Sequence, residues 1–271
     1  MMTRLSKQLR ILAASVILAL GAGATSSAYA GVFQVTPSGD GLAPTLTTPV
    51  NADSLGGASS TLLTYEGGGV YDAVGYIDFS AFSLAGNAIG ANKTGLNFYY
   101  GLYATFNQTF SCPGALVPGS PISCTAQSIS LNLYANPGDG NSYTQASLTG
   151  PMVTDSKVSA GDILLGTSTV ITGPSSAGIN SDLGAFENLT SNFSLTSAGS
   201  AFFTAPVPFY DIAFSEYNNT STGLNCSPVT GECAVTFETG STNFAQTPEP
   251  ASVAIFGLGL IGLAFMRRKS L

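Results

Sequence analysis

The sequence predicts an all-β protein: one antiparallel β-sandwich or jelly-roll-like domain between two targeting segments. About nine short stretches of alternating or continuous apolar residues lie in the body of the chain, residues 31–246, and Gly, Pro and Asn separate them. No stretch of this body keeps a helical period over three turns. The body is also long enough to bury a substantial core as a single domain.

The predicted strands follow one another from the start of the body. The first covers 32–35, and a connection rich in Thr, Pro, Gly and Asn extends from it to about residue 60. The alternation is clearest where Ile129, Leu131 and Leu133 share one face. The other strands are expected at 61–65, 70–82, 96–106, 127–134, 162–171, 192–195, 201–204, 209–214 and 234–238. Residues 239–246 are predicted to be a linker.

Four cysteines lie in the body, which favours disulfides if the chain is exported to an oxidising compartment. They allow three pairings. We prefer the local one, Cys112 with Cys124 and Cys226 with Cys233, because each pair brackets a short loop containing Pro and Gly. The alternative, a metal site, lacks both histidine and a C-x-x-C pair.

The charge of the body excludes several classes of function. Fourteen acidic residues against Lys93 and Lys157 give residues 31–247 a formal charge of −12, compared with −7 for the whole chain. Binding to nucleic acid or to anionic lipid by charge is therefore disfavoured. The chain has no histidine, so a Ser-His-Asp site and a histidine-bound metal are excluded as well.

Carboxylates are the remaining candidates for catalysis. Asp72 with Asp78, or Asp211 with Glu216, are the pairs that glycoside hydrolysis would use. The sequence offers no context that would raise their pKa values, so solvated strand carboxylates are the preferred interpretation and no enzyme activity is expected.

Calcium is considered at one turn of the body. Asn136, Asp139 and Asn141 could offer oxygen ligands to this cation, but their spacing does not follow the EF-hand loop. An Asn-Pro-Gly-Asp-Gly turn explains these residues, and no cofactor or metal is assigned.

The first thirty residues have the pattern of a signal peptide. A basic start is followed by an apolar stretch from Ile11 to Ala22, and Ala28 and Ala30 form an A-x-A cleavage site. The alternative, an N-terminal transmembrane anchor, would need a longer apolar stretch.

Residues 247–271 form a three-part tail. Pro248, Glu249 and Pro250 are followed by an uncharged run at 251–266 and by a basic end. A helix over this run would rise about 24 Å, slightly less than the roughly 30 Å core of a bilayer. The basic end consists of Arg267, Arg268 and Lys269. Its charge favours the cytoplasmic side, which places the body across the membrane. An ordinary C-terminal anchor is the alternative, but it needs no Pro-Glu-Pro.

The tail resembles the PEP-CTERM sorting signal of Gram-negative bacteria in motif, order and position. That resemblance implies that the precursor inserts transiently into the inner membrane. An exosortase-type membrane protease would then remove the tail and release the body to the cell surface or the extracellular matrix.

The body also resembles a known group. Its matching segments are 33–38, 100–104, 198–203 and, most specifically, Ala-Pro-Val-Pro-Phe-Tyr at 205–210. They look like the flocculation-associated PEP-CTERM proteins of floc-forming bacteria. The resemblance implies a non-enzymatic protein that promotes cell aggregation by associating with exopolysaccharide, and it carries over no binding residues. A secreted carbohydrate-active enzyme and a self-assembling surface-layer protein are the alternatives.

Aromatic faces suit the apolar side of sugars, and the segments 96–103 and 202–210 are the most aromatic. Alternation lets only about half of the aromatic side chains of a strand face outward. Tyr99, Tyr103 and Tyr210 are therefore the predicted glycan contacts.

Overall fold

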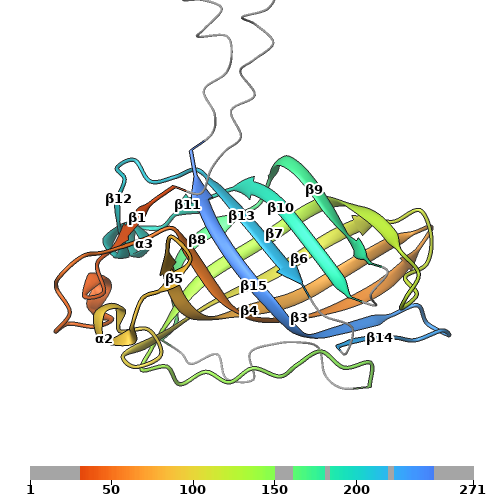
Figure 1. The fold of residues 1–271 in the computed structure, drawn as a ribbon, viewed down its shortest axis with the longest axis horizontal. Coiled ribbons are helices and arrows are strands. Elements are labelled where there is room, and N and C mark those ends of the chain that lie inside the picture. The colour runs from red at the N-terminus through yellow and green to blue at the C-terminus, as the bar shows by residue number, and fades with distance from the viewer. Residues whose placement is uncertain (1–30, 150–160, 181–183, 219–222, 247–271) are drawn as a thin grey trace, which may run out of the picture. The chain divides into compact units, whose positions relative to one another are not determined.

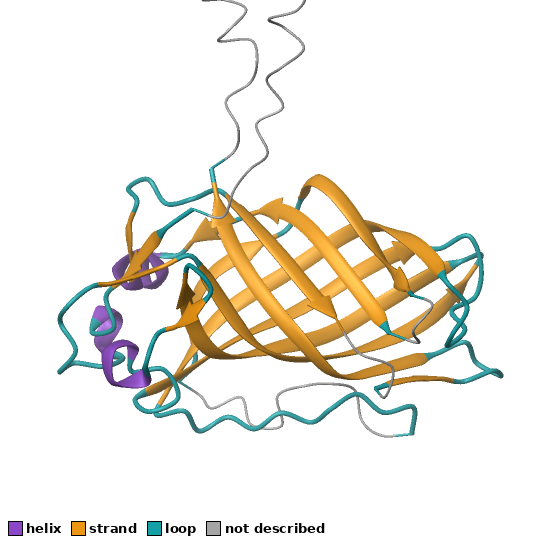
Figure 2. Cartoon of the chain, in the orientation of Figure 1, coloured by secondary structure: helices purple, strands orange, loops and turns teal. Residues whose placement is uncertain are grey.

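The long strands of this protein form one antiparallel sheet, which confirms the predicted all-β class. The structure, a computed structural model, describes residues 31–149, 161–180, 184–218 and 223–246. The signal peptide with Ala28 and Ala30, and the sorting tail with Pro248, Glu249, Pro250, Arg267, Arg268 and Lys269, lie outside the described residues. Figure 2 shows that strands dominate the described part and that the short helices gather at one end of the sheet.

The strands and helices follow in chain order. They are β1 (Phe33–Val35), η1 (Gly39–Gly41), β2 (Val50–Ala52), β3 (Ser54–Gly67), β4 (Val70–Leu84), β5 (Asn87–Ala88), α2 (Ala91–Thr94), β6 (Tyr100–Ser111), β7 (Ile122–Pro137), β8 (Ile163–Ser168), β9 (Ile171–Ile179), β10 (Ala185–Asn192), β11 (Ser194–Leu195), α3 (Ser197–Phe202), β12 (Phe203–Ala205), β13 (Ile212–Asn218), β14 (Leu224–Cys226) and β15 (Cys233–Ala245).

Strand β7 closes the main sheet on itself. The order along the sheet is β11, β8, β7, β6, β4, β3, β15, β13, β10 and β9. Residues 131–135 of β7 pair with β8, where Leu131 lies opposite Ser168, and residues 122–124 pair with β9, where Cys124 lies opposite Ala177. In Figure 1, β15, β13 and β10 cross in front of β7, β6 and β4, so the two layers around the core belong to the same sheet.

This closure corrects the predicted sandwich or jelly roll. The long strands of the described residues do not divide between two stacked sheets. Alternation of apolar and polar residues identifies the buried face of a strand. It does not tell whether the layer across the core is a second sheet or the far side of the same sheet.

Two strands are longer than the sequence predicts, because glycine and small polar residues take part in pairing. Strand β3 begins at Ser54, inside the predicted connection, and β15 continues to Ala245, through the predicted linker. Gly57 shows why a small residue suits β3: a Cβ atom there would lie 2.0 Å from the carbonyl oxygen of Asp78 on β4. The shift in register between Gly56 and Gly57 lies at the same place.

Two other predicted strands are displaced. The strand expected from residue 96 begins at Tyr100, after helix α2 and its C-cap Gly95, which has a φ of 78°. The strand expected at 201–204 is divided, because residues 201–202 end helix α3 and residues 203–204 belong to β12. The N-cap of α3, Thr196, accepts a hydrogen bond from the backbone N–H of Gly199 at 3.0 Å.

The inner face of the closed sheet carries the core. On β4, Tyr71, Ala73, Ile77 and Phe79 belong to this core. At one end, a small sheet of order β12, β1 and β2 covers it. A phenylalanine cluster fills that end, with ring centroids 5.3 Å apart for Phe33 and Phe244, 5.2 Å for Phe203 and Phe209, and 4.8 Å for Phe193 and Phe244. The Ala-Pro-Val-Pro-Phe-Tyr segment thus contributes Phe209 to the packing of this end.

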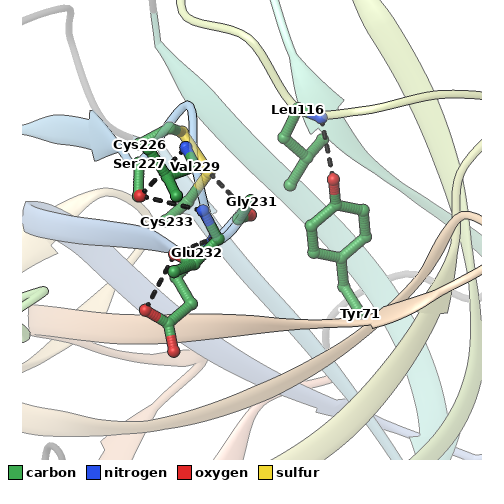
Figure 3. Close-up of a disulfide and its surroundings, with 9 residues drawn as sticks. Tyr71, Leu116, Cys226, Ser227, Val229, Gly231, Glu232 and Cys233 are labelled. Carbon is green, nitrogen blue, oxygen red and sulfur yellow. Dashed lines mark hydrogen bonds between the residues drawn. A yellow bond between two sulfur atoms is a disulfide. The ribbon is translucent and has the colours of Figure 1, made fainter.

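The two disulfides are Cys112–Cys124 and Cys226–Cys233, the pairing preferred from the sequence. Figure 3 shows Cys226–Cys233 across the β14–β15 hairpin, whose turn is held by the backbone N–H of Val229 donating to Ser227 Oγ at 3.3 Å. The loop closed by Cys112–Cys124 carries Leu116, which is buried. Its backbone N–H donates to the Tyr71 hydroxyl at 2.9 Å (Figure 3).

Removing the disulfides should lower stability unequally. Replacing Cys112 and Cys124 together by Ser is expected to lower the free energy of unfolding by about 3 kcal/mol, and replacing Cys226 and Cys233 by about 2 kcal/mol, since the second loop is shorter. Urea unfolding of the oxidised proteins measures both values. Reductant should bring the parent protein to the stability of a variant that lacks both disulfides. Unchanged stability in either pair variant would contradict the prediction.

Candidate functional site

Tyr103, one of the three predicted glycan contacts, is buried, so the prediction is wrong for this residue. Its side chain is 2% exposed, and its hydroxyl donates to Asp162 Oδ2 at 2.6 Å. Its ring stacks on Tyr134 with centroids 5.1 Å apart and lies 5.7 Å from the ring of Tyr143. Tyr143 belongs to the segment after β7, which packs on the outer face of the sheet and covers β6 there. The sequence gives no sign of this covering segment.

The other two tyrosines have different surroundings. Tyr99, in the turn before β6, is 37% exposed, and its neighbour Phe98 is 72% exposed. Their rings meet edge to face at 4.9 Å. Tyr210 is half-buried, and its hydroxyl donates to the carbonyl oxygen of Val32 at 2.8 Å. Of the three, only Tyr99 offers much of its ring to solvent, so the three do not form one aromatic patch.

The turn considered for calcium is held by its own hydrogen bonds. Asn136 is fully buried, and its Oδ1 accepts from the backbone N–H groups of Gly140 at 2.6 Å and Asn141 at 3.1 Å. The side-chain amides of Asn136 and Asn141 donate to the two oxygens of Asp162, at 2.5 and 2.8 Å. Within the described ranges, no group of three or more His, Cys, Asp or Glu is placed to hold a metal ion. Asp162, which anchors this turn from just before β8, was not among the residues predicted to matter there.

The structure separates one of the two carboxylate pairs considered for glycoside hydrolysis, Asp72 with Asp78. Asp72 and Asp78 lie on the same face of β4, but six residues of strand separate them by roughly 20 Å, twice the distance that glycoside hydrolysis allows. Asp211 is exposed just before β13, and the side chain of Glu216 lies outside the described part. The structure instead brings Asp139 close to Asp78. Burial, together with the charge of Asp139, raises the pKa of Asp78 to about 6.

A buried carboxyl group that the sequence did not indicate lies inside the closed sheet. Glu238 on β15 is 2% exposed, and its Oε2 accepts from Ser59 Oγ at 2.8 Å and Thr61 Oγ1 at 3.2 Å. Burial raises the pKa of Glu238 to about 8, the two hydroxyls oppose this shift, and buried Glu187 on β10 adds to it. Regular alternation from Val235 would place Glu238 on the outer face. A register shift between Val235 and Glu238 turns it inward.

A surface groove of about 640 Å³ is formed by described residues on three segments of the chain. Residues 45–51 form one wall, and Leu84, Ile89, Asn92 and Lys93 form the rest. Helix α2 positions the last two, and Gly95 behind it is packed so closely that a Cβ atom there would lie 3.2 Å from Leu46 Cδ1. The sequence did not predict this groove, because it is assembled from three separate segments.

The lining of the groove combines an aliphatic surface with neutral polar groups. Leu46, Val50, Leu84 and Ile89 supply the aliphatic part. Threonine hydroxyls and two asparagine carboxamides supply donors and acceptors, and no carboxylate is among the lining residues. Small-molecule sites commonly have this composition and a volume of roughly 300–1000 Å³. We take this feature, the Lys93 groove, as the candidate binding site.

The raised pKa of Glu238 predicts a pH-dependent stability. The carboxyl binds a proton in the folded protein up to about pH 8, whereas in the unfolded chain it loses the proton near 4.5. The contribution of Glu238 to the stability of the fold is therefore fully present below pH 4.5 and is lost as the pH rises toward 8. We expect the free energy of unfolding to fall over this range. Glu238→Gln should flatten the fall, and the exposed control Glu66→Gln should not. If urea unfolding gave Glu238→Gln and the parent the same change in free energy of unfolding with pH, the prediction would be contradicted.

Comparison with known proteins assigns the C-terminal tail. Residues 246–269 match the model of the PEP-CTERM protein-sorting motif. No curated protein and no solved structure matches this chain. Within the part that the structure describes, none of the helices has the length and hydropathy needed to span a bilayer. The chain thus carries a PEP-CTERM sorting motif, which implies an exported protein that is anchored in the membrane by its C-terminal signal before an exosortase processes it.

Proposed function

We propose that the β domain is a non-enzymatic surface or matrix protein that promotes cell aggregation by associating with exopolysaccharide. The observation that carries the proposal is the sorting motif at residues 246–269, which implies that the protein is exported and so supports a role outside the cytosol. The body resembles flocculation-associated proteins in sequence, which supports the same role.

The Lys93 groove gives this role a candidate surface. Its volume of about 640 Å³ and its threonine and asparagine lining suit sugar hydroxyl groups, and its aliphatic residues suit the C–H side of a sugar ring. The proposed contact is therefore non-covalent and needs no catalytic group.

Deletion of the gene tests the proposal. The deletion strain should settle more slowly than its parent, and the full chain supplied in trans should restore settling. A chain with Pro248→Ala and Pro250→Ala should not, because the altered motif would leave the domain unsorted. Settling is measured together with immunodetection of the domain in the matrix fraction. A deletion strain that flocculates as its parent does would contradict the aggregation role.

A carbohydrate-active enzyme is the second candidate, and one observation favours it. A carboxyl with its pKa raised to about 6, as in Asp78, is suited to general acid catalysis, and Asp139 is the charged neighbour that contributes to this shift. Release of reducing ends from floc polysaccharide by the purified protein would support this candidate. The activity should then be lost in Asp78→Asn and kept in Asp72→Asn, which alters the same face of β4. Absence of release in the parent protein would reject it.

A further inference from the structure

The Lys93 groove differs in charge from the rest of the described surface. Lys93 is the single basic residue within 31–149, 161–180, 184–218 and 223–246, where twelve residues are acidic. It is exposed, and it lines the groove beside Asn92. An anionic ligand therefore meets repulsion from carboxylates over much of this domain, and an attractive charge at this groove.

The groove walls are held by backbone contacts, so the site is largely formed before any ligand binds. Asp53 Oδ2 accepts from the backbone N–H of Ala85 at 2.7 Å, which fixes the turn after Leu84. The backbone N–H of Ile89 donates to the carbonyl oxygen of Phe82 at 2.8 Å. A preformed site loses less conformational entropy on binding than a mobile one.

The neutral polar groups of the groove are placed for a polyhydroxylated ligand. Asn51 Oδ1 accepts from Gln34 Nε2 at 3.2 Å, which orients its carboxamide and leaves its NH₂ group for a ligand. Asn92 and Lys93 of helix α2 also line the groove, and Thr47 and Thr48 add two hydroxyls. The groove therefore presents hydroxyl and amide groups together with one ammonium group.

From these observations we infer that the Lys93 groove binds an acidic saccharide, a segment of polymer that carries uronate carboxylates. The Lys93 ammonium pairs with a carboxylate, and the asparagine and threonine groups bind sugar hydroxyls. This inference rests on the proposed association with polysaccharide and names its chemical class. Lys93 acts as a point charge, which places no strict demand on the orientation of the carboxylate.

Titration calorimetry with two oligosaccharides tests the inference. The probes are tetragalacturonate and the neutral galactose tetramer of the same length, each added to the purified mature protein. The parent protein should bind the acidic tetramer more tightly, and added salt should weaken that binding. Lys93→Gln should weaken it about tenfold, as expected for a lost charge-assisted contact, and Lys93→Arg should largely retain it. Val229→Glu, which makes the same change in net charge on the exposed β14–β15 hairpin, should bind as the parent does.

The possible outcomes separate this inference from the proposed function. Equal binding of both tetramers with no effect of Lys93→Gln would overturn the acidic class and leave the polysaccharide association standing. Acetate competing as effectively as the acidic tetramer, at equal carboxylate concentration, would mean a simple anion site and would also overturn the inference. Binding of neither tetramer would overturn it too. The settling of the deletion strain then decides separately whether the proposed function survives.

Discussion

The dual pairing of β7 is the constraint on which the rest of the fold depends. This strand of sixteen residues pairs with β8 through residues 131–135 and with β9 through residues 122–124, and so joins the two ends of the sheet. Closure pairs backbone groups that would otherwise lie along open edges, where they could recruit another chain. It also divides the protein into an inside and an outside, and each side chain of a long strand must belong to one of them.

The interior of the closed sheet is filled by the core and covered at one end, so the candidate binding site lies on the surface. The phenylalanine cluster with the small sheet covers one end, and Leu116 in the Cys112–Cys124 loop is buried against the core. Glu238 is enclosed there with a raised pKa, so it acts on stability and has no access to a polymer. The Lys93 groove lies at the surface, where β2 of the small sheet, the end of β4 and helix α2 meet, and its residues Leu46, Val50 and Ile89 also pack against the core.

Several aromatic residues that the sequence suggests for sugar binding have a structural role. Tyr76 on β4 and Tyr103 on β6 lie on the outer face of the sheet, and both rings pack against Tyr143 of the segment that follows β7. Asp162 ties this segment to the sheet through Tyr103 and two asparagines. Polar and aromatic groups that suggest sugar binding thus serve to attach a long connection. The proposed contact surface is aliphatic, amide and hydroxyl in character.

The sequence by itself determined the features that depend on local pattern. Alternation identified β4 and much of β7, loop-bracketing cysteines indicated the disulfide pairs, and the motif around Pro248–Glu249–Pro250 indicated sorting. Tertiary structure alone decided the rest. Closure depends on strands far apart in the chain, the inward turn of Glu238 depends on a register shift, and the burial of Tyr103 depends on a segment forty residues later. Periodicity in the sequence indicates only which side chains of one strand share a face. These three features, like the Lys93 groove, arise between segments that meet only in the folded chain.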